Sequence, residues 1–334
     1  MSTKLIVVIG ATGLQGGSVA RHFASLPNWR VRAITRDPSK PSATALRDQG
    51  IDEVVAADLD DPTSLNKAFA GANVIFANTD FWQFLQNPTT FEQASKASKL
   101  PNQIAYDLEV QQGKNAVDAA ASHADNLDLF IWSTLSDTKK WSQGAIEWNL
   151  HFDSKAAVAA YIRSDAHAAG LANKTSYLQV GMYLQNWKMN PALRPEKRAD
   201  GSFALSAPKV METFAAPLVD PAHDTGLFVE ALVNSPAGSA MLGYARETAY
   251  GDYWRLWAKI QGVKLEILDE ELDFGEEMPE WLKQEFRDAF KYCFEYGFAG
   301  GDPEVKGPEA FGADMGRMTD LEEWIRREDW SSIL

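Results

Sequence analysis

The sequence is poor in the residues that build disulfide frameworks and metal sites. Cys293 is the one cysteine among 334 residues, so no disulfide can form within a single chain. The five histidines show no H-x-x-x-H spacing, and with a single cysteine this argues against a zinc site. We therefore expect no bound metal, and a fold that depends on its hydrophobic core.

Long apolar runs and an excess of positive charge are also missing. No run of about 18 apolar residues occurs, so no transmembrane helix and no membrane partner are expected. The chain starts Met1-Ser2-Thr3-Lys4 and passes into an apolar stretch that lacks the pattern of a signal peptide. We expect a cytoplasmic protein, with the nucleus as a second compartment. The net charge of −14 disfavours direct binding to nucleic acid, whose phosphates it would repel.

The strongest positive feature is a glycine-rich stretch near the N-terminus. The apolar residues 5–9 predict a buried strand, and residues 18–24 predict a helix. Between them, Gly10, Gly13 and Gly16 have the G-x-x-G-x-x-G spacing of a dinucleotide-binding turn. In such a turn the backbone approaches a pyrophosphate, which the helix N-terminus then holds. A purely structural glycine turn is the alternative.

The end of the second predicted strand bears on the choice of cofactor. Residues 29–35 alternate as a strand does, and Arg36 follows, with Lys40 nearby. An acidic residue at this place suits the ribose hydroxyl of NAD, whereas an arginine suits the 2′-phosphate of NADP. Asp37 is acidic, but we expect Pro38 to turn it outward. The pattern favours NADP(H) over NAD(H), with a solvated surface arginine as the alternative.

Two further strands end in polar residues. Residues 54–57 lead into Asp58, which we expect to accept from the adenine amino group, while Asp61 before Pro62 is expected to cap a helix. Residues 73–77 form the next predicted strand and lead to the same edge. Residues 83–103 lack periodicity and are interpreted as a long loop, either a lid over the cofactor or a surface insertion.

The rest of the chain completes an α/β pattern. Helices over residues 104–122 and 151–162, with strands at 127–132 and 175–180, predict a doubly wound parallel-sheet Rossmann domain over residues 1–182. Residues 183–334 are expected to form a smaller α+β C-terminal domain for a substrate or partner, with 217–235 returning to the first domain. In the amphipathic helix at 280–296, Cys293 falls in the apolar stripe and is interpreted as a core thiol.

Lys155 and His151 are the candidate catalytic residues. They lie four apart on one helical face, in the region where short-chain dehydrogenases carry a tyrosine and a lysine four apart. There the tyrosine is the general acid and the lysine holds the nicotinamide ribose. A histidine transfers protons near neutral pH, but it is equally an ordinary polar residue of a helix N-terminus.

Four segments together resemble the NmrA-like family, an atypical branch of the short-chain dehydrogenase superfamily. They are residues 10–20, 35–38, 112–115 and His151-Phe152-Asp153-Ser154-Lys155, and the last is the most specific. The resemblance covers nearly the whole chain. It implies a Rossmann domain with a smaller C-terminal domain that binds NADP(H). The cofactor contacts implied by the matching positions are Gly10, Ala11, Thr12, Gly13, Leu14, Gln15, Arg36, Lys40, Asp58, Leu59, Thr79, Asp80, Phe81, Lys155, Tyr183, Leu184, Gln185 and Asn186.

Two functions are consistent with this resemblance. The favoured one is a redox-responsive regulator that senses the NADPH/NADP ratio and acts on a protein partner, as in transcriptional regulation. The absence of the tyrosine general acid supports it. The alternative is an NADPH-dependent reductase of a small apolar carbonyl, quinone or imine-type substrate, with Lys155 or His151 as proton donor. A homodimer is left open for both.

Overall fold

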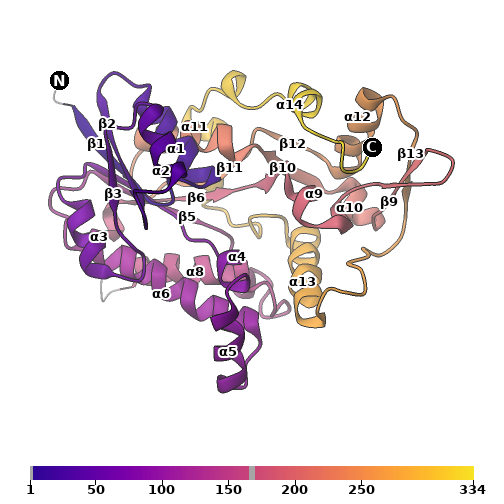
Figure 1. The fold of residues 1–334 in the computed structure, drawn as a ribbon, viewed down its shortest axis with the longest axis horizontal. Coiled ribbons are helices and arrows are strands. Elements are labelled where there is room, and N and C mark those ends of the chain that lie inside the picture. The colour runs from indigo at the N-terminus through magenta and orange to yellow at the C-terminus, as the bar shows by residue number, and fades with distance from the viewer. Residues whose placement is uncertain (1–2, 165–169) are drawn as a thin grey trace.

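A parallel sheet forms the part of the molecule that lies at the left in Figure 1. The computed structural model describes residues 3–164 and 170–334. Within these residues the sheet has eight strands in the order β14-β11-β6-β5-β4-β1-β2-β3, and every neighbouring pair is parallel. The strands are β1 (Lys4–Val8), β2 (Trp29–Thr35), β3 (Glu53–Ala56), β4 (Val74–Ala77), β5 (Leu129–Thr134), β6 (Thr175–Val180), β11 (Ala240–Gly243) and β14 (Val305–Lys306).

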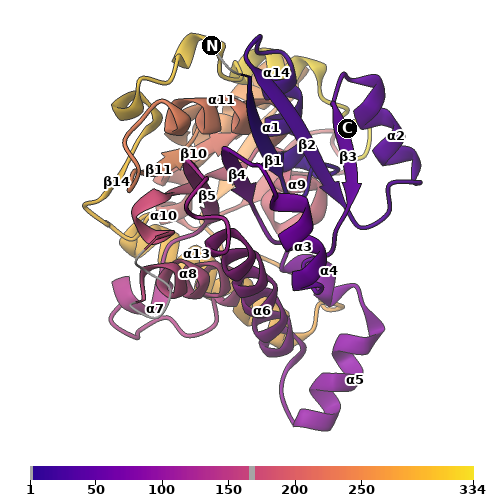
Figure 2. The same ribbon diagram turned by 90° about the vertical axis from the view of Figure 1, so that its left-hand side faces the viewer.

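Helices cover both faces of this sheet, which confirms the predicted doubly wound α/β class (Figure 2). Alternate residues of β1 point to opposite faces: Val7 packs in one apolar cluster and Val8 in the other. The cluster around Val7 includes residues of α3 (Pro62–Phe69), α6 (Pro101–Ala121) and α8 (Leu150–Arg163). The cluster around Val8 includes residues of α1 (Leu14–Ala24), α2 (Pro41–Asp48) and α11 (Pro221–Val233).

The strand order places a topological switch point beside β1. The chain runs from β1 to β2 and β3 on one side, and then crosses to β4 on the other side. In open α/β sheets, ligands bind at such a switch point, beyond the carboxyl ends of the strands. The loops after β1, β2 and β4 therefore form the expected binding edge.

The interpretation of residues 83–103 as a loop is wrong. The stretch contains α4 (Trp82–Leu85) and α5 (Pro88–Ala97), followed directly by the start of α6. Pro88 and Pro101 each occupy the first turn of a helix, where the missing N–H is tolerated. The Asn87 side chain caps α5 by accepting from the N–H of Thr89. Figure 2 shows α5 projecting from the body of the molecule.

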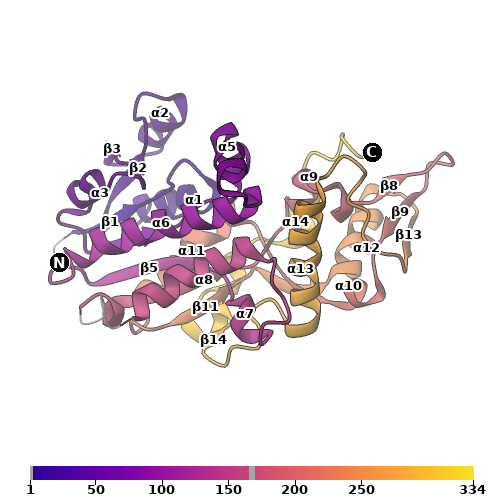
Figure 3. The ribbon, with the colours of Figure 1, turned by 90° about the horizontal axis from the view of Figure 1, so that it is seen from below.

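The last part of the chain adds two small sheets, and Figure 3 labels the strands β8, β9 and β13 of one of them. It also contributes an aromatic core. Trp254, Trp257 and Trp330 are almost fully buried there. One sheet pairs β7 (Met182–Tyr183), β10 (Ala215–Val219) and β12 (Arg246–Ala249), and the other pairs β8 (Glu196–Lys197), β9 (Phe203–Ser206) and β13 (Leu265–Leu268). The remaining helices are α7 (Thr138–Trp141), α9 (Asn186–Met189), α10 (Lys209–Thr213), α12 (Tyr250–Gln261), α13 (Glu280–Tyr296) and α14 (Leu321–Arg327).

The chain returns to the large sheet several times after residue 183. Helix α11 lies against α1, where Ser18 Oγ donates to the carbonyl of His223 and accepts from the N–H of Gly226. Strands β11 and β14 extend the large sheet at the β6 edge. A division of the chain into residues 1–182 and 183–334 therefore remains a proposal about function, with elements of the second part built into the first.

Cys293 is buried on α13 beside Ile146, Phe152 and Tyr292. Burial raises the pKa of its thiol to about 12, so the thiol stays protonated near neutral pH. This agrees with the interpretation of Cys293 as a core residue. Among the described residues, no cluster of His, Cys, Asp and Glu has the composition of a metal site, and no helix is long and apolar enough to cross a membrane.

Candidate functional site

The glycine turn after β1 has the geometry of a phosphate-binding turn. Gly10 has a φ of +66°, a conformation that residues with a Cβ rarely adopt, and its carbonyl accepts from the N–H of Gly13. A Cβ on Gly16 would lie 2.4 Å from the carbonyl oxygen of Gly10, so only glycine lets α1 approach the strand this closely. No side chain caps α1 and its first turn has no acidic residue, which leaves its positive end available to an anion.

Around this turn the predicted contact residues differ in exposure. Ala11 is buried, whereas Thr12 and Leu14 are exposed. The Gln15 side chain connects two strands: its Oε1 accepts from Ser133 Oγ at 2.7 Å, and its Nε2 donates to Tyr183 Oη at 2.6 Å. Burial raises the pKa of Tyr183 to about 12, so the phenol stays neutral. Gln15 and Tyr183, which are far apart in the sequence, are thus brought together.

Arg36 and Lys40 place positive charge at the end of β2. Both side chains are exposed, and Arg36 Nη1 lies 3.5 Å from Oε1 of Gln83. The Asp37 carboxylate is turned to Ser39, whose Oγ and N–H both donate to it and hold the Asp37 pKa below its usual value. The competing acidic residue is therefore engaged locally, and the two cations remain available at this edge.

Asp58 and Asp61, the two acidic residues after β3 with predicted roles, make different contacts in the structure. Asp61 caps α3 by accepting from the N–H groups of Thr63 and Ser64, as expected. Asp58 is half-buried and accepts from the N–H of Asp60 at 3.0 Å. The Leu59 carbonyl accepts from Asn115 Nδ2 at 2.7 Å, which fixes this loop against α6.

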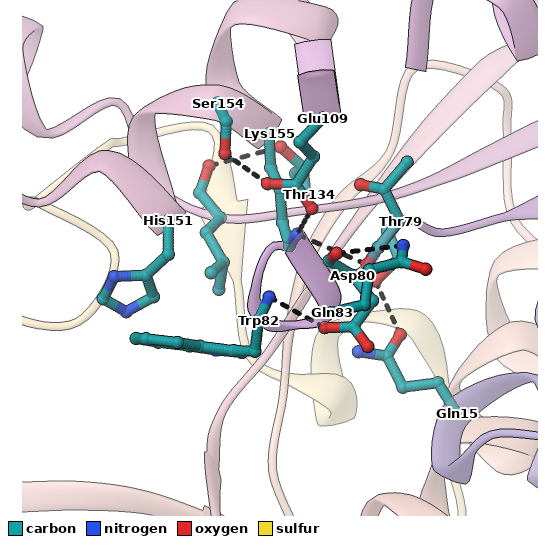
Figure 4. Close-up of polar contacts among 12 residues, drawn as sticks. Gln15, Thr79, Asp80, Trp82, Gln83, Glu109, Thr134, His151, Ser154 and Lys155 are labelled. Atoms are coloured by element: carbon teal, nitrogen blue, oxygen red, sulfur yellow. Dashed lines mark hydrogen bonds and ion pairs between the residues drawn. The ribbon is translucent and has the colours of Figure 1, made fainter. Parts of the chain in front are cut away.

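Lys155 lies at the carboxyl end of β4 (Figure 4). Its ammonium forms an ion pair with Glu109 of α6 and lies 3.4 Å from the carbonyl of Thr79. The second oxygen of the Glu109 carboxylate accepts from Ser154 Oγ. Because Glu109 is fully buried, these contacts satisfy a charge that would otherwise be strongly unfavourable. The structure thus brings Lys155 to Thr79, while Asp80 beside it is exposed.

His151 lies one turn before Lys155 but in a different environment. Its Nδ1 is 2.7 Å from Oε1 of Glu285 on α13, and its ring centroid is 4.9 Å from that of Trp82. Figure 4 shows the imidazole over Trp82, away from the Lys155 ammonium. The two candidate catalytic residues share α8, but each has its own carboxylate partner.

The remaining predicted cofactor contacts do not all present their side chains to the binding edge. Phe81 and Leu184 bury their side chains in apolar clusters, so only their backbones are available to a ligand. Asn186 begins α9, and the side-chain oxygen of Gln185 is buried without a hydrogen-bond partner. A buried polar atom without a partner is unusual, and a ligand or a water molecule would satisfy it.

Sequence reasoning missed both carboxylates that hold the candidate residues. A signal was present, because Glu109 and Glu285 interrupt the buried stripes of α6 and α13. Glu109 lies between the buried residues Ala105 and Gly113, and Glu285 lies four residues before the buried Ala289. A charge at such a position needs a partner inside the protein. The sequence, however, does not say which partner.

The chain is also similar to a known protein family. The model of the NmrA-like family matches residues 2–325. The chain belongs to the NmrA-like family. A relative from Aspergillus hancockii, the NmrA-like family domain-containing oxidoreductase hkm9, is 30% identical over 186 residues, which are 56% of this chain and 48% of that protein. A second such oxidoreductase, ptmS from Penicillium ochrochloron, is 25% identical over 276 residues, or 78% of this chain and 74% of that protein.

The match to the Aspergillus protein thus spans about half of that relative's length. Among solved structures, NmrA, a negative transcriptional regulator in complex with NADP, superposes with a TM-score of 0.72 at 18% identity. This match covers 100% of this chain and 97% of that one. At this identity, the match shows that the two proteins share a fold.

Proposed function

We propose that this NmrA-like protein binds NADP(H) and is an NADPH-dependent reductase of a small apolar carbonyl, quinone or imine-type substrate. The observation that carries the proposal is the position of Lys155. A buried carboxylate, Glu109, holds its ammonium against the Thr79 carbonyl at the carboxyl end of β4, next to the switch point. The oxidoreductase names of the curated relatives support the same function.

The residues around the switch point fit the parts of this cofactor. The uncapped N-terminus of α1 suits the pyrophosphate, and the exposed Gly13, which has no side chain, lets the phosphate approach the backbone. Arg36 and Lys40 suit the 2′-phosphate, because an arginine forms strong charge-assisted bonds with phosphate oxygens. Asp58 and the Leu59 loop suit the adenine. On the other side of the switch point, Thr79 and Lys155 suit the nicotinamide ribose.

The protein's own contribution to the reaction is then positioning and proton transfer. When bound, the reduced cofactor supplies a hydride to the substrate. Lys155 has three donors, of which Glu109 and the Thr79 carbonyl take two, so one remains for a ribose hydroxyl. His151 is the candidate proton donor for the substrate heteroatom, since imidazole exchanges protons near neutral pH.

A regulator that responds to NADPH/NADP is the second candidate. The specific observation in its favour is the contact between Arg36 and Gln83, because Gln83 belongs to α4, which carries Trp82 over His151. A 2′-phosphate at Arg36 would compete with Gln83 and so alter the packing of α4. The regulator NmrA, which has the same fold, also supports this candidate. A regulatory protein partner belongs to this candidate.

Turnover and binding measured together separate the two candidates. NADPH oxidation is followed with a panel of quinones, carbonyls and imines, using wild type, Lys155→Ala and the exposed control Lys96→Ala. A reductase turns over at least one compound, Lys155→Ala weakens NADPH binding, and the control matches wild type. Absence of turnover, with NADPH changing the proteolysis of residues 83–103 or the mass in solution, supports the regulator. No turnover and no cofactor-dependent change rules out both.

A further inference from the structure

A buried carboxylate from the last part of the chain holds His151. Glu285 lies on α13, 134 residues from His151 in the sequence, and its side chain has no exposed surface. Its Oε1 accepts from the backbone N–H of His151 at 2.9 Å and lies 2.7 Å from Nδ1 of the ring. Its Oε2 accepts from Asn102 Nδ2 of α6 at 2.9 Å. Figure 3 shows α13 standing beside the end of α8.

These contacts determine which ring nitrogen carries a proton. The backbone N–H of His151 and the side-chain amide of Asn102 donate to the two oxygens of Glu285, one to each. A carboxylate acceptor requires a proton on Nδ1 of His151. The neutral ring therefore has its lone pair on Nε2. The backbone contact and the side-chain contact share one oxygen, so the ring is fixed both in tautomer and in direction.

Aromatic neighbours restrict the ring further. The centroids of Phe152 and Trp82 lie 5.0 Å and 4.9 Å from that of His151, with interplanar angles of 84° and 47°. The side chain of His151 retains 15% of its exposure. The ring is thus packed on its sides, bonded at Nδ1 and still partly open to the outside.

We propose that Glu285 is a positioning residue that prepares His151 to transfer a proton through Nε2. The inference rests on the proposed reductase function. In this proton transfer, the Nε2–H bond of the His151 imidazolium breaks, and the proton forms a bond to the substrate oxygen or nitrogen. The hydride and its electron pair come from NADPH, which becomes NADP⁺. The ring is left neutral with Nδ1–H still bonded to Glu285, and solvent restores the proton on Nε2.

Because Glu285 belongs to α13, the proton donor is complete only when this helix is docked on α8. The cofactor side of the site has no such requirement, since Glu109, Lys155 and Thr79 all come from the first half of the chain. Loss of Glu285 should therefore affect proton transfer and leave cofactor binding intact.

The test is the tautomer of His151 in the full-length protein, measured without substrate. Long-range ¹H–¹⁵N correlation spectra of histidine-labelled protein above neutral pH, assigned with His151→Gln, should show a protonated Nδ1 and an unprotonated Nε2. In Glu285→Gln the ring should shift toward the Nε2–H form. A wild-type ring with its proton on Nε2 overturns the proposal, and this result needs no variant of Glu285 that folds.

Kinetics give the second readout and a matched control. Glu285→Gln should lower kcat by about tenfold or more, up to the full contribution of general acid catalysis, while NADPH affinity stays within about twofold of wild type. Asp288→Asn is the control, because Asp288 also ties α13 to the α8 side through the N–H groups of Glu147 and Trp148 but does not touch the ring. Equal losses in both variants, with an unchanged tautomer, contradict the proposal. The predicted tautomer and its shift without any turnover uphold the positioning role, and only the reductase function then fails.

Discussion

Two side chains of α8 contact buried carboxylates, and these carboxylates come from different parts of the chain. Lys155 pairs with Glu109, 46 residues away, on the neighbouring α6. His151 pairs with Glu285, 134 residues away, on α13. The first pair lies wholly among elements that flank the sheet, whereas the second joins the sheet side to the last part of the chain. The difference indicates that the Lys155 pair is built from neighbouring elements, whereas the His151 pair depends on how α13 is docked.

Removing the phosphate site should have the largest effect and should be confined to the cofactor side. Gly13→Val would fill the space where the pyrophosphate is expected, and we predict that binding of NADPH and NADH falls below detection in titration calorimetry. The fold should persist, since a Cβ on Gly13 meets only the Gly10 carbonyl, at 3.3 Å. The Nδ1–H tautomer of His151 should persist too. Normal NADPH binding by the folded variant would show that the phosphate site lies elsewhere.

A third buried carboxylate, that of Asp153 on α8, should affect stability but neither cofactor binding nor proton transfer. Asp153 is buried, accepts from the N–H of Thr138, and has its pKa raised by this burial to about 6. Because the folded state binds this proton more tightly than the unfolded state does, this group makes the protein less stable as pH rises from about 4 through 6.

Asp153→Asn removes that penalty. We predict that the variant gains on the order of 2 kcal/mol relative to wild type between pH 4 and 7 in urea unfolding. The amide oxygen of asparagine still accepts from Thr138, so the contact with α7 is kept. An identical difference between variant and wild type at both pH values would contradict the assignment.

Arg36→Ala should discriminate between the two cofactors. A charge-assisted contact to a phosphate contributes about 1.5–3 kcal/mol, so NADPH affinity should fall about tenfold or more while NADH affinity changes little. Calorimetric titration with both cofactors measures this. If the two affinities fall equally, Arg36 does not contact the 2′-phosphate.

The parts that the sequence predicted well depend on local physics. The strand at residues 175–180 was predicted with the boundaries of β6, and Gly10 has the positive φ that a tight turn requires. Residues 83–103 were misread because they lack a clear apolar periodicity, although Pro88 starts a helix. Strands β11 and β14 have only four and two residues, too few for a periodic pattern.

The candidate site shows the same limit. The spacing of His151 and Lys155 indicated a shared helix face, which α8 provides. Their partners could not be predicted, because the pairing of Glu285 with His151 depends on the docking of a distant helix and not on any local pattern. Gln15 and Tyr183 were each predicted as contacts, but their mutual hydrogen bond is a product of the tertiary fold.

The most direct test of the account compares His151→Ala with Lys155→Ala in one experiment, measuring kcat at saturating NADPH and the Kd of NADPH. The account predicts that His151→Ala lowers kcat by about 10²–10⁴-fold with an unchanged Kd. It predicts that Lys155→Ala chiefly raises the Kd, with a much smaller loss of kcat once the cofactor is saturating. The reverse pattern, with the large loss of kcat in Lys155→Ala and little change in His151→Ala, would contradict it.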